Sequence, residues 1–385
     1  MYMNHGTAHS PLDHRTWISK HRNEIMGLMA LLIIVYHARW TTGVPLYDNT
    51  INRYGSIGVD VFVFVSGFGL AYSLTKTPDV GAFMRKRLAR ILPAYYAFEG
   101  INLLVVLLLM ALGIQNNLMQ PIESILPVGV WFNFDSNRNL AYKWYISATL
   151  GFYVMSIFIY PVLRKSKYLY LNAFLFLLVT VAFIPYIADM SHMPFALQRI
   201  PALVVGLTVG VASLRREAQY RNGMTGQIFL ALLCLLGILM IALEGQLPGK
   251  YLQKMTDASH LSLKQALIAP LFTVLLAAVL ELFEKFRLAD LVKCLDWLGK
   301  LSLELYLIHS ILSGVLDLTS LPKAAQVLLT VLLSIPAALL LKYIAAQLLR
   351  IWRKVSVHFV TNDSDPLLPA QPSEKSVYGA GEKGS

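Results

Sequence analysis

The sequence is poor in charged residues and in cysteine. Charged side chains make up 14% of the 385 residues and hydrophobic ones 56%, whereas soluble domains carry about 25% charged and about 45–50% apolar residues. The two cysteines, Cys234 and Cys294, stand apart in or beside different apolar segments. This spacing excludes a disulfide framework and a cysteine zinc site, so we interpret both as packing residues. There is also no GxxxxGK[ST], HExxH or clustered metal-ligand pattern, and we expect no metal and no bound cofactor.

Acidic residues are fewer than basic ones, 22 against 33, which gives a formal net charge of +11. A basic chain could bind nucleic acid. Here, however, the lysines and arginines cluster at the ends of apolar runs, a pattern that is typical of membrane topology and of contact with anionic lipid headgroups. We therefore expect membrane lipids, and no nucleic acid, among the partners.

Repeated apolar runs of about 17–25 residues dominate the chain, and each is long enough to cross a bilayer core. They predict an all-α fold, a polytopic bundle of about ten transmembrane helices. These cover about 24–40, 56–75, 91–113, 144–163, 168–187, 200–214, 226–243, 263–283, 301–317 and 326–349. Most lysines and arginines fall in loops on the N-terminal side, so both termini are predicted to be cytoplasmic.

The polar ends frame a single membrane domain over residues 23–350. Residues 1–22 are predicted to form a cytoplasmic N-terminal segment, and residues 351–385 a cytoplasmic, largely disordered tail rich in Pro, Ser, Gly and charge. The first apolar run lacks a small-x-small cleavage site after it, so we expect it to remain as a helix. The longest outer loop, residues 114–143, is broken by prolines and is interpreted as a re-entrant or interfacial lid.

A histidine and an aspartate stand out within the first two predicted helices. His37 lies past the midplane of the first helix, and Asp60 lies about one turn below the outer end of the second. If these helices pack together, Asp60 can orient the imidazole of His37, an arrangement suited to a general base that activates a hydroxyl. The alternative is an interfacial histidine and an aspartate that caps its helix.

A basic cluster, Arg85, Lys86, Arg87 and Arg90, precedes the third predicted helix. One interpretation is a topology signal. The other is a phosphate clamp, because the arginine fork matches phosphate geometry and coenzyme A carries several phosphates in the cytosol. The residues alone leave both interpretations open.

Six further residues are candidates for acceptor binding or for structure: Ser66, Trp144, Tyr153, Arg199, Glu304 and His309. The serine belongs to a Ser-Gly-Phe-Gly stretch, which favours close helix packing over a nucleophile. The two aromatic residues are typical of an interfacial belt, although they could also stack on a sugar. Arg199 fits an interface anchor. Glu304 and His309 are two ionisable groups in one short span, which is unusual in a membrane helix.

Six stretches, in order, resemble the acyltransferase-3 family of multi-pass membrane O-acyltransferases. They are LLIIVYHA, GVDVFVFVSGFGL, FMRKRLARILPAYY, WYISATLGFY, QRIPALVVGLTVG and LGKLSLELYLIH. The resemblance implies about ten core helices, a cytosolic acyl-CoA donor that is most often acetyl-CoA, and a hydroxyl acceptor on a glycan or lipid-linked sugar. It also implies that His37 is the essential histidine and that Arg87 and Arg90 form the basic motif.

The sequence departs from the pattern of this family at two positions. Met26 stands where many members carry an arginine or lysine, eleven residues before the histidine, and Thr149 stands where many carry a glutamate. Arg22 and Arg39 are the candidates to replace the first of these charges.

Together these features predict an acyl-CoA-dependent O-acyltransferase of a bacterial plasma (inner) membrane, which O-acetylates a cell-envelope polysaccharide or its lipid-linked precursor. Acetyl-CoA would be a co-substrate. The main alternative is a transporter that exports a glycan or lipid-linked intermediate, because buried ionisable residues and broken helices also suit transport. A structural partner in a synthesis complex is a weaker third hypothesis.

Overall fold

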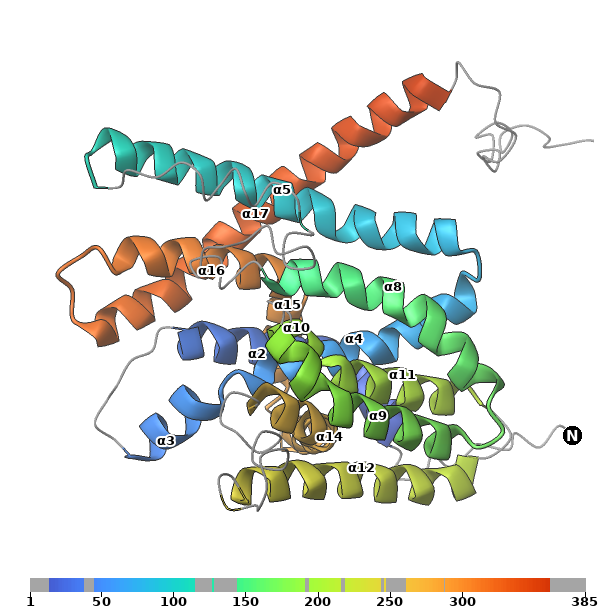
Figure 1. Ribbon diagram of the computed structural model, residues 1–385. Coiled ribbons are helices and arrows are strands. Elements are labelled where there is room, and N and C mark those ends of the chain that lie inside the picture. Colours follow the sequence, from blue (N-terminus) through green and yellow to red (C-terminus); the bar gives the residue numbers. More distant parts are fainter. Residues whose placement is uncertain are drawn as a thin grey trace, which may run out of the picture.

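A computed structural model describes residues 14–37, 45–114, 127, 144–190, 194–215, 219–243, 246, 261–286 and 288–360. Its described residues form helices and no strand, which confirms the predicted all-α class (Figure 1). The helices in chain order are α1 (His14–Lys20), α2 (Arg22–His37), α3 (Pro45–Tyr54), α4 (Ile57–Lys76), α5 (Val80–Ala111), α8 (Trp144–Lys165), α9 (Leu169–Met190), α10 (Pro194–Leu197), α11 (Ile200–Leu214), α12 (Gln219–Ala242), α14 (Leu261–Lys285), α15 (Ala289–Gly299), α16 (Ser302–Leu316) and α17 (Lys323–Val360).

Six helices of the described chain are long and apolar enough to cross a membrane: α4, α5, α8, α14, the Met224–Ala242 part of α12 and the Lys323–Trp352 part of α17. Three shorter apolar helices accompany them: α11, α16 and the Leu169–Phe183 part of α9. Large apolar side chains remain exposed along α5, α9, α12 and α17, where a bilayer would cover them. The protein is thus a multi-pass membrane protein. The total of ten spans and the cytoplasmic location of both termini stay predictions.

Helix α4 is the centre of the bundle, and nearly every residue from Gly58 to Ala71 on it is buried. It packs most extensively against α11 and also contacts α2, α8 and α14 (Figure 1). Glycines permit the tight crossing with α11. A Cβ atom on Gly206 would lie 2.2 Å from the carbonyl oxygen of Phe64, and one on Gly67 would lie 2.6 Å from that of Leu203. Close packing, the favoured interpretation of the Ser-Gly-Phe-Gly stretch, is therefore confirmed for Gly67.

Helix α2, which carries His37, packs against α15, a short amphipathic helix that the apolar runs of the sequence do not predict. The two backbones nearly touch, because a Cβ atom on Gly299 would lie 1.8 Å from the carbonyl oxygen of Asn23. The Asn23 amide donates a 2.9 Å hydrogen bond to the carboxylate of Asp296 on α15. Hydrogen bonds from Lys300 and Asn23 hold the pKa of Asp296 below its usual value.

Several boundaries differ from those predicted. Helix α5 begins at Val80, where Asp79 accepts a 2.6 Å hydrogen bond from the backbone amide of Ala82. The basic cluster therefore lies on α5 itself and not on an approach to it. Helix α17 continues to Val360, past the predicted domain boundary at 350, and α1 makes part of the N-terminal segment helical. The predicted lid over most of 114–143 and the tail after 360 lie outside the described residues.

Candidate functional site

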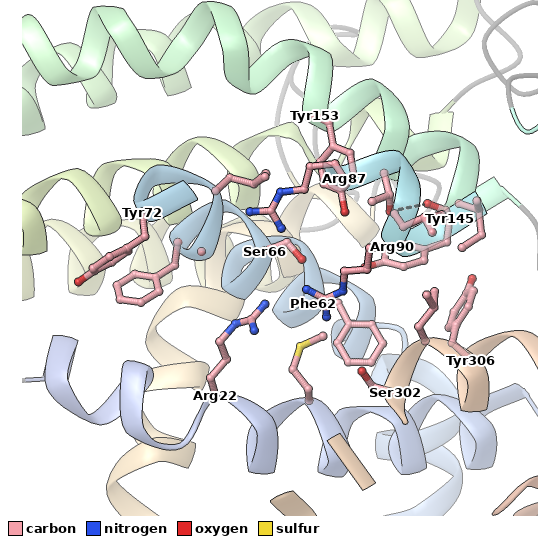
Figure 2. A pocket seen from close by; sticks show the side chains of 18 of the residues that line it. Arg22, Phe62, Ser66, Tyr72, Arg87, Arg90, Tyr145, Tyr153, Ser302 and Tyr306 are labelled. Carbon is pink, nitrogen blue, oxygen red and sulfur yellow. Dashed lines mark hydrogen bonds between the residues drawn. The ribbon is translucent and has the colours of Figure 1, made fainter. Parts of the chain in front are cut away.

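A cavity of about 360 Å³ opens between α2, α4, α5, α8 and α16. Charged, polar, aromatic and aliphatic side chains all contribute to its wall (Figure 2). Its lining residues are Ser19, Arg22, Met26, Phe62, Ser66, Phe68, Gly69, Leu70, Tyr72, Arg87, Arg90, Ile91, Tyr145, Ile146, Thr149, Tyr153, Ser302, Leu303 and Tyr306.

Three arginines converge on this cavity. Figure 2 shows Arg22 reaching from α2, and Arg87 and Arg90 reaching from α5, toward the same space. The lining set holds no aspartate or glutamate, and within the described chain no carboxylate forms an ion pair with any of the three. The buried Nε atoms of Arg22 and Arg87 have no hydrogen-bond partner there. Arg22 and Arg87 are partly buried, and Arg90 is exposed. Partly buried cations without a counter-charge are costly, so this arrangement favours an anionic ligand.

Aromatic rings support one of these arginines. The Arg87 guanidinium lies 5.5 Å from the ring centroid of Phe83 and 5.8 Å from that of Tyr153. Both rings are buried, and they meet edge-on with centroids 6.5 Å apart. A guanidinium over an aromatic face is attracted without being neutralised, so Arg87 is oriented and still carries a full charge.

One arginine of the predicted phosphate clamp does not line the cavity, and a different arginine does. Arg85 is exposed on α5 and is not among the residues that line the cavity, whereas Arg22 is. From the sequence, Arg22 is only one of two candidates to replace the charge that is missing at Met26. Met26 lines the same cavity one turn along α2. The i, i+4 spacing of these two residues on one helix face was the signal that could have chosen Arg22 over Arg39.

His37 meets a second histidine. Its Nδ1 atom lies 2.8 Å from Nε2 of His309 on α16, a residue 272 positions away in the sequence. The ring of His309 is fully buried, whereas that of His37 is partly exposed. The Nδ1 atom of His309 also lies 3.2 Å from the backbone carbonyl oxygen of Leu305. The partner of His37 is therefore His309, across α2 and α16, and not the predicted Asp60.

Asp60 has a different neighbour from the one expected. Its Oδ1 atom lies 3.4 Å from Nε of Arg199, at the start of α11, and neither carboxylate oxygen accepts a hydrogen bond within the described structure. Within the described residues, no hydrogen bond or ion pair joins Asp60 to His37. The Arg199 guanidinium also lies 4.6 Å from the ring centroid of the partly exposed Trp144, so these three predicted candidates form one group.

Two tyrosines connect the arginines to the histidines. The Tyr145 and Tyr306 rings have centroids 4.8 Å apart, and both residues line the cavity. The Tyr306 ring also lies edge-on to that of His309, with centroids 5.7 Å apart. The histidine pair is therefore one aromatic layer beyond the cavity wall.

The remaining predicted candidates divide into two groups. Ser66 and Tyr153 line the cavity, whereas Glu304 lies on α16 without belonging to its lining. Beyond the predicted set, His21, Glu281 and Glu284 bring their ligand atoms within 4.8 Å of one another. The Nζ atom of Lys20 lies 2.9 Å from Glu281 and 2.6 Å from Glu284, so a lysine already supplies the positive charge between these carboxylates.

Comparison with known proteins places this geometry in a family. No curated protein and no solved structure matches the chain. The family model described as an acyltransferase domain matches residues 27–346, which covers nearly all of the helices that form the cavity and the histidine pair. The chain therefore belongs to the acyltransferase-3 family.

Proposed function

We propose that this membrane acyltransferase moves an acetyl group from cytosolic acetyl-CoA to a hydroxyl of a cell-surface or lipid-linked glycan, within a plasma membrane. The observation that carries the donor half of the proposal is the set of three arginines, which line one cavity and form no ion pair with any carboxylate of the described residues. Coenzyme A carries a diphosphate and a 3′-phosphate, and arginine binds such groups through paired, charge-assisted hydrogen bonds. The acceptor class follows the family resemblance.

The length of α2 suits the reach of the donor. Arg22 is the first residue of this helix and His37 is the last, so they lie about 22 Å apart along its axis at about 1.5 Å per residue. Coenzyme A separates its phosphates from its thioester by an extended pantetheine arm. Phosphates held by Arg22, Arg87 and Arg90 would leave this arm to pass Tyr306 toward the histidine pair.

The proposed reaction is a direct transfer with His37 as general base. His37 takes the proton of the acceptor hydroxyl while the hydroxyl oxygen attacks the thioester carbonyl. The carbon–sulfur bond then breaks, the acetyl group stays on the acceptor oxygen, and the thiolate of coenzyme A takes the proton from His37. An acetyl-histidine intermediate is the covalent variant of the same scheme.

Two measurements on purified protein in detergent test this proposal. The first is thermal stability with and without acetyl-CoA, since a ligand at about 100 times its Kd stabilises the folded state by about 2.7 kcal/mol. The second is acetyl-CoA consumption with an added glycan acceptor, compared between wild type and His37→Ala. Binding and consumption in wild type, with consumption lost in a folded His37→Ala protein, would support the enzyme. Binding without consumption would favour the transporter, and full activity of His37→Ala would overturn the role of the histidine.

A further inference from the structure

We infer that His309 is a positioning residue that fixes His37 in the tautomer whose Nε2 atom is free of a proton and can act as the base. The catalytic role of His309 rests on the proposed function, whereas the tautomer of His37 follows from the geometry alone. The expected orienting group, Asp60, forms its ion pair with Arg199 instead.

The tautomers follow from donor and acceptor chemistry. The backbone carbonyl of Leu305 can only accept a hydrogen bond, so the Nδ1 atom of His309, 3.2 Å away, must be the protonated donor. In a neutral imidazole, the Nε2 atom of His309 then holds a lone pair. That atom lies 2.8 Å from Nδ1 of His37, so His37 donates from Nδ1. A neutral His37 protonated at Nδ1 presents its lone pair at Nε2.

The ring geometry fits this hydrogen bond. The two imidazole planes differ by 2°, and the centroids are 5.1 Å apart while the bonded nitrogens are 2.8 Å apart. Because the centroid separation exceeds the nitrogen separation by about the width of one ring, the rings lie in one plane, edge to edge. The N–H of His37 therefore points along the in-plane lone pair of His309, which is the favourable direction for a hydrogen bond.

Burial assigns the two rings to different tasks. His309 is 0% exposed, with Tyr306 edge-on to its ring, whereas His37 is partly exposed. Only His37 can meet a substrate, and His309 acts through it. When His37 takes a proton at Nε2, its Nδ1–H still donates to His309, so the buried ring gains no proton. A neutral partner also avoids the desolvation cost of a carboxylate in this position.

The decisive variants are His309→Met and His309→Gln. Methionine fills the space without an acceptor, and glutamine can place its carbonyl oxygen near the position of Nε2. We expect His309→Met to reduce kcat by about 10²–10⁴-fold, the contribution of a correctly oriented general base, with unchanged KM for acetyl-CoA and an unchanged stability shift. We expect His309→Gln to recover part of kcat. Wild-type kcat in a folded His309→Met protein, or no recovery in a folded His309→Gln protein, would overturn the inference.

A second measurement requires no activity. Nitrogen-15 NMR of histidine-labelled wild-type protein reports which ring nitrogen carries the proton, and His37→Gln assigns the signal. We expect the Nδ1–H form of His37 in wild type and loss of that preference in His309→Met. A wild-type His37 protonated at Nε2 would overturn the inference even if acetyl transfer were confirmed. If His37 shows the expected tautomer but the protein never consumes acetyl-CoA, the inference about His309 stands and only the proposed function is overturned.

Discussion

Arg199 and Asp60 form an ion pair inside the bundle, with 3.4 Å between Nε and Oδ1 and side chains that are 3% and 0% exposed. The pair joins the start of α11 to the first turn of α4, the two helices that pack most extensively. Asp60, which was expected to orient His37, thus links α4 to α11 through Arg199. The Trp144 ring lies over the guanidinium of this arginine.

We expect Asp60→Asn and Arg199→Gln each to lower stability strongly, by about 3–5 kcal/mol, because each removes one of the two opposite charges of a buried ion pair. The double variant should lose less than the sum of the two, and thermal unfolding in detergent measures this coupling. Asp290 and Lys293 form the matched control, an ion pair whose side chains are 97% and 76% exposed. Their variants should change stability little. Additive losses at Asp60 and Arg199 would contradict the structural role of the pair.

Arg22 should contribute as much to the binding of acetyl-CoA as Arg87 does. Arg22→Gln and Arg87→Gln each remove one cation from the cavity, so we expect each to weaken the stability shift caused by acetyl-CoA, while Arg85→Gln on the exposed side of α5 leaves it unchanged. The loss corresponds to about 1.5–3 kcal/mol of binding, the value of a hydrogen bond to a charged group. Titration of the melting temperature with acetyl-CoA and with dephospho-CoA measures it. Equal weakening in Arg85→Gln would mean a diffuse electrostatic effect.

The exchange of Arg22 and Met26 tests whether the cation can move one turn along α2. Both residues line the cavity. In Arg22→Met/Met26→Arg, the charge returns at the position where many family members carry it, so we expect a larger acetyl-CoA shift than in Arg22→Met alone. The same melting-temperature titration compares the two variants. No recovery in the exchange variant would show that the cavity requires the cation at position 22.

Much of the fold could be predicted because hydrophobic length is a local property. The apolar runs located α8, α11 and α16 within one or two residues. Short helices such as α15 were missed because their apolar residues follow one face and form no continuous run. The start of α5 was placed late because the charged residues before Ile91 lowered the local hydropathy, although they are helical.

The sequence predicts which ionisable residues belong to the site, but not which of them contact one another. The sequence singled out His37, Asp60 and His309, because ionisable groups in apolar helices need partners, and it gave Arg199 as an interface anchor. Which group meets which depends on how α2, α4, α11 and α16 pack, and His37 and His309 are 272 residues apart. Helix depth alone suggested His37 with Asp60. The depth of a residue in the membrane does not tell how its helix is rotated about its own axis, and this rotation decides which neighbouring helix the side chain faces.

Gly206 should tolerate no side chain. Its Cβ atom would meet three backbone atoms of α4, the carbonyl oxygen of Phe64 at 2.2 Å, the nitrogen of Phe68 at 3.0 Å and the Cα atom of Gly67 at 3.1 Å. None can move without shifting a helix, so Gly206→Ala should cost at least about 1–3 kcal/mol. Gly100→Ala on α5, where a Cβ meets nothing within 4 Å, is the control and should stabilise its helix by about 1 kcal/mol. Similar melting temperatures for the two variants would refute the tight crossing.

Tyr306 lies between the arginine-lined cavity and the histidine pair, so under the proposed function the size of its ring should control the loss of acetyl groups to water. The ring is 2% exposed, lies 4.8 Å from that of Tyr145 and touches the edge of His309. Tyr306→Ala opens this layer, and we expect acetyl-CoA hydrolysis without acceptor to rise relative to acetyl transfer, because water is no longer excluded from the thioester. Tyr306→Phe keeps the ring and should keep the wild-type ratio. Since the ratio of hydrolysis to transfer is independent of the amount of folded protein, it separates this effect from lost stability. An unchanged ratio in Tyr306→Ala would mean that the acetyl group reaches His37 by another path.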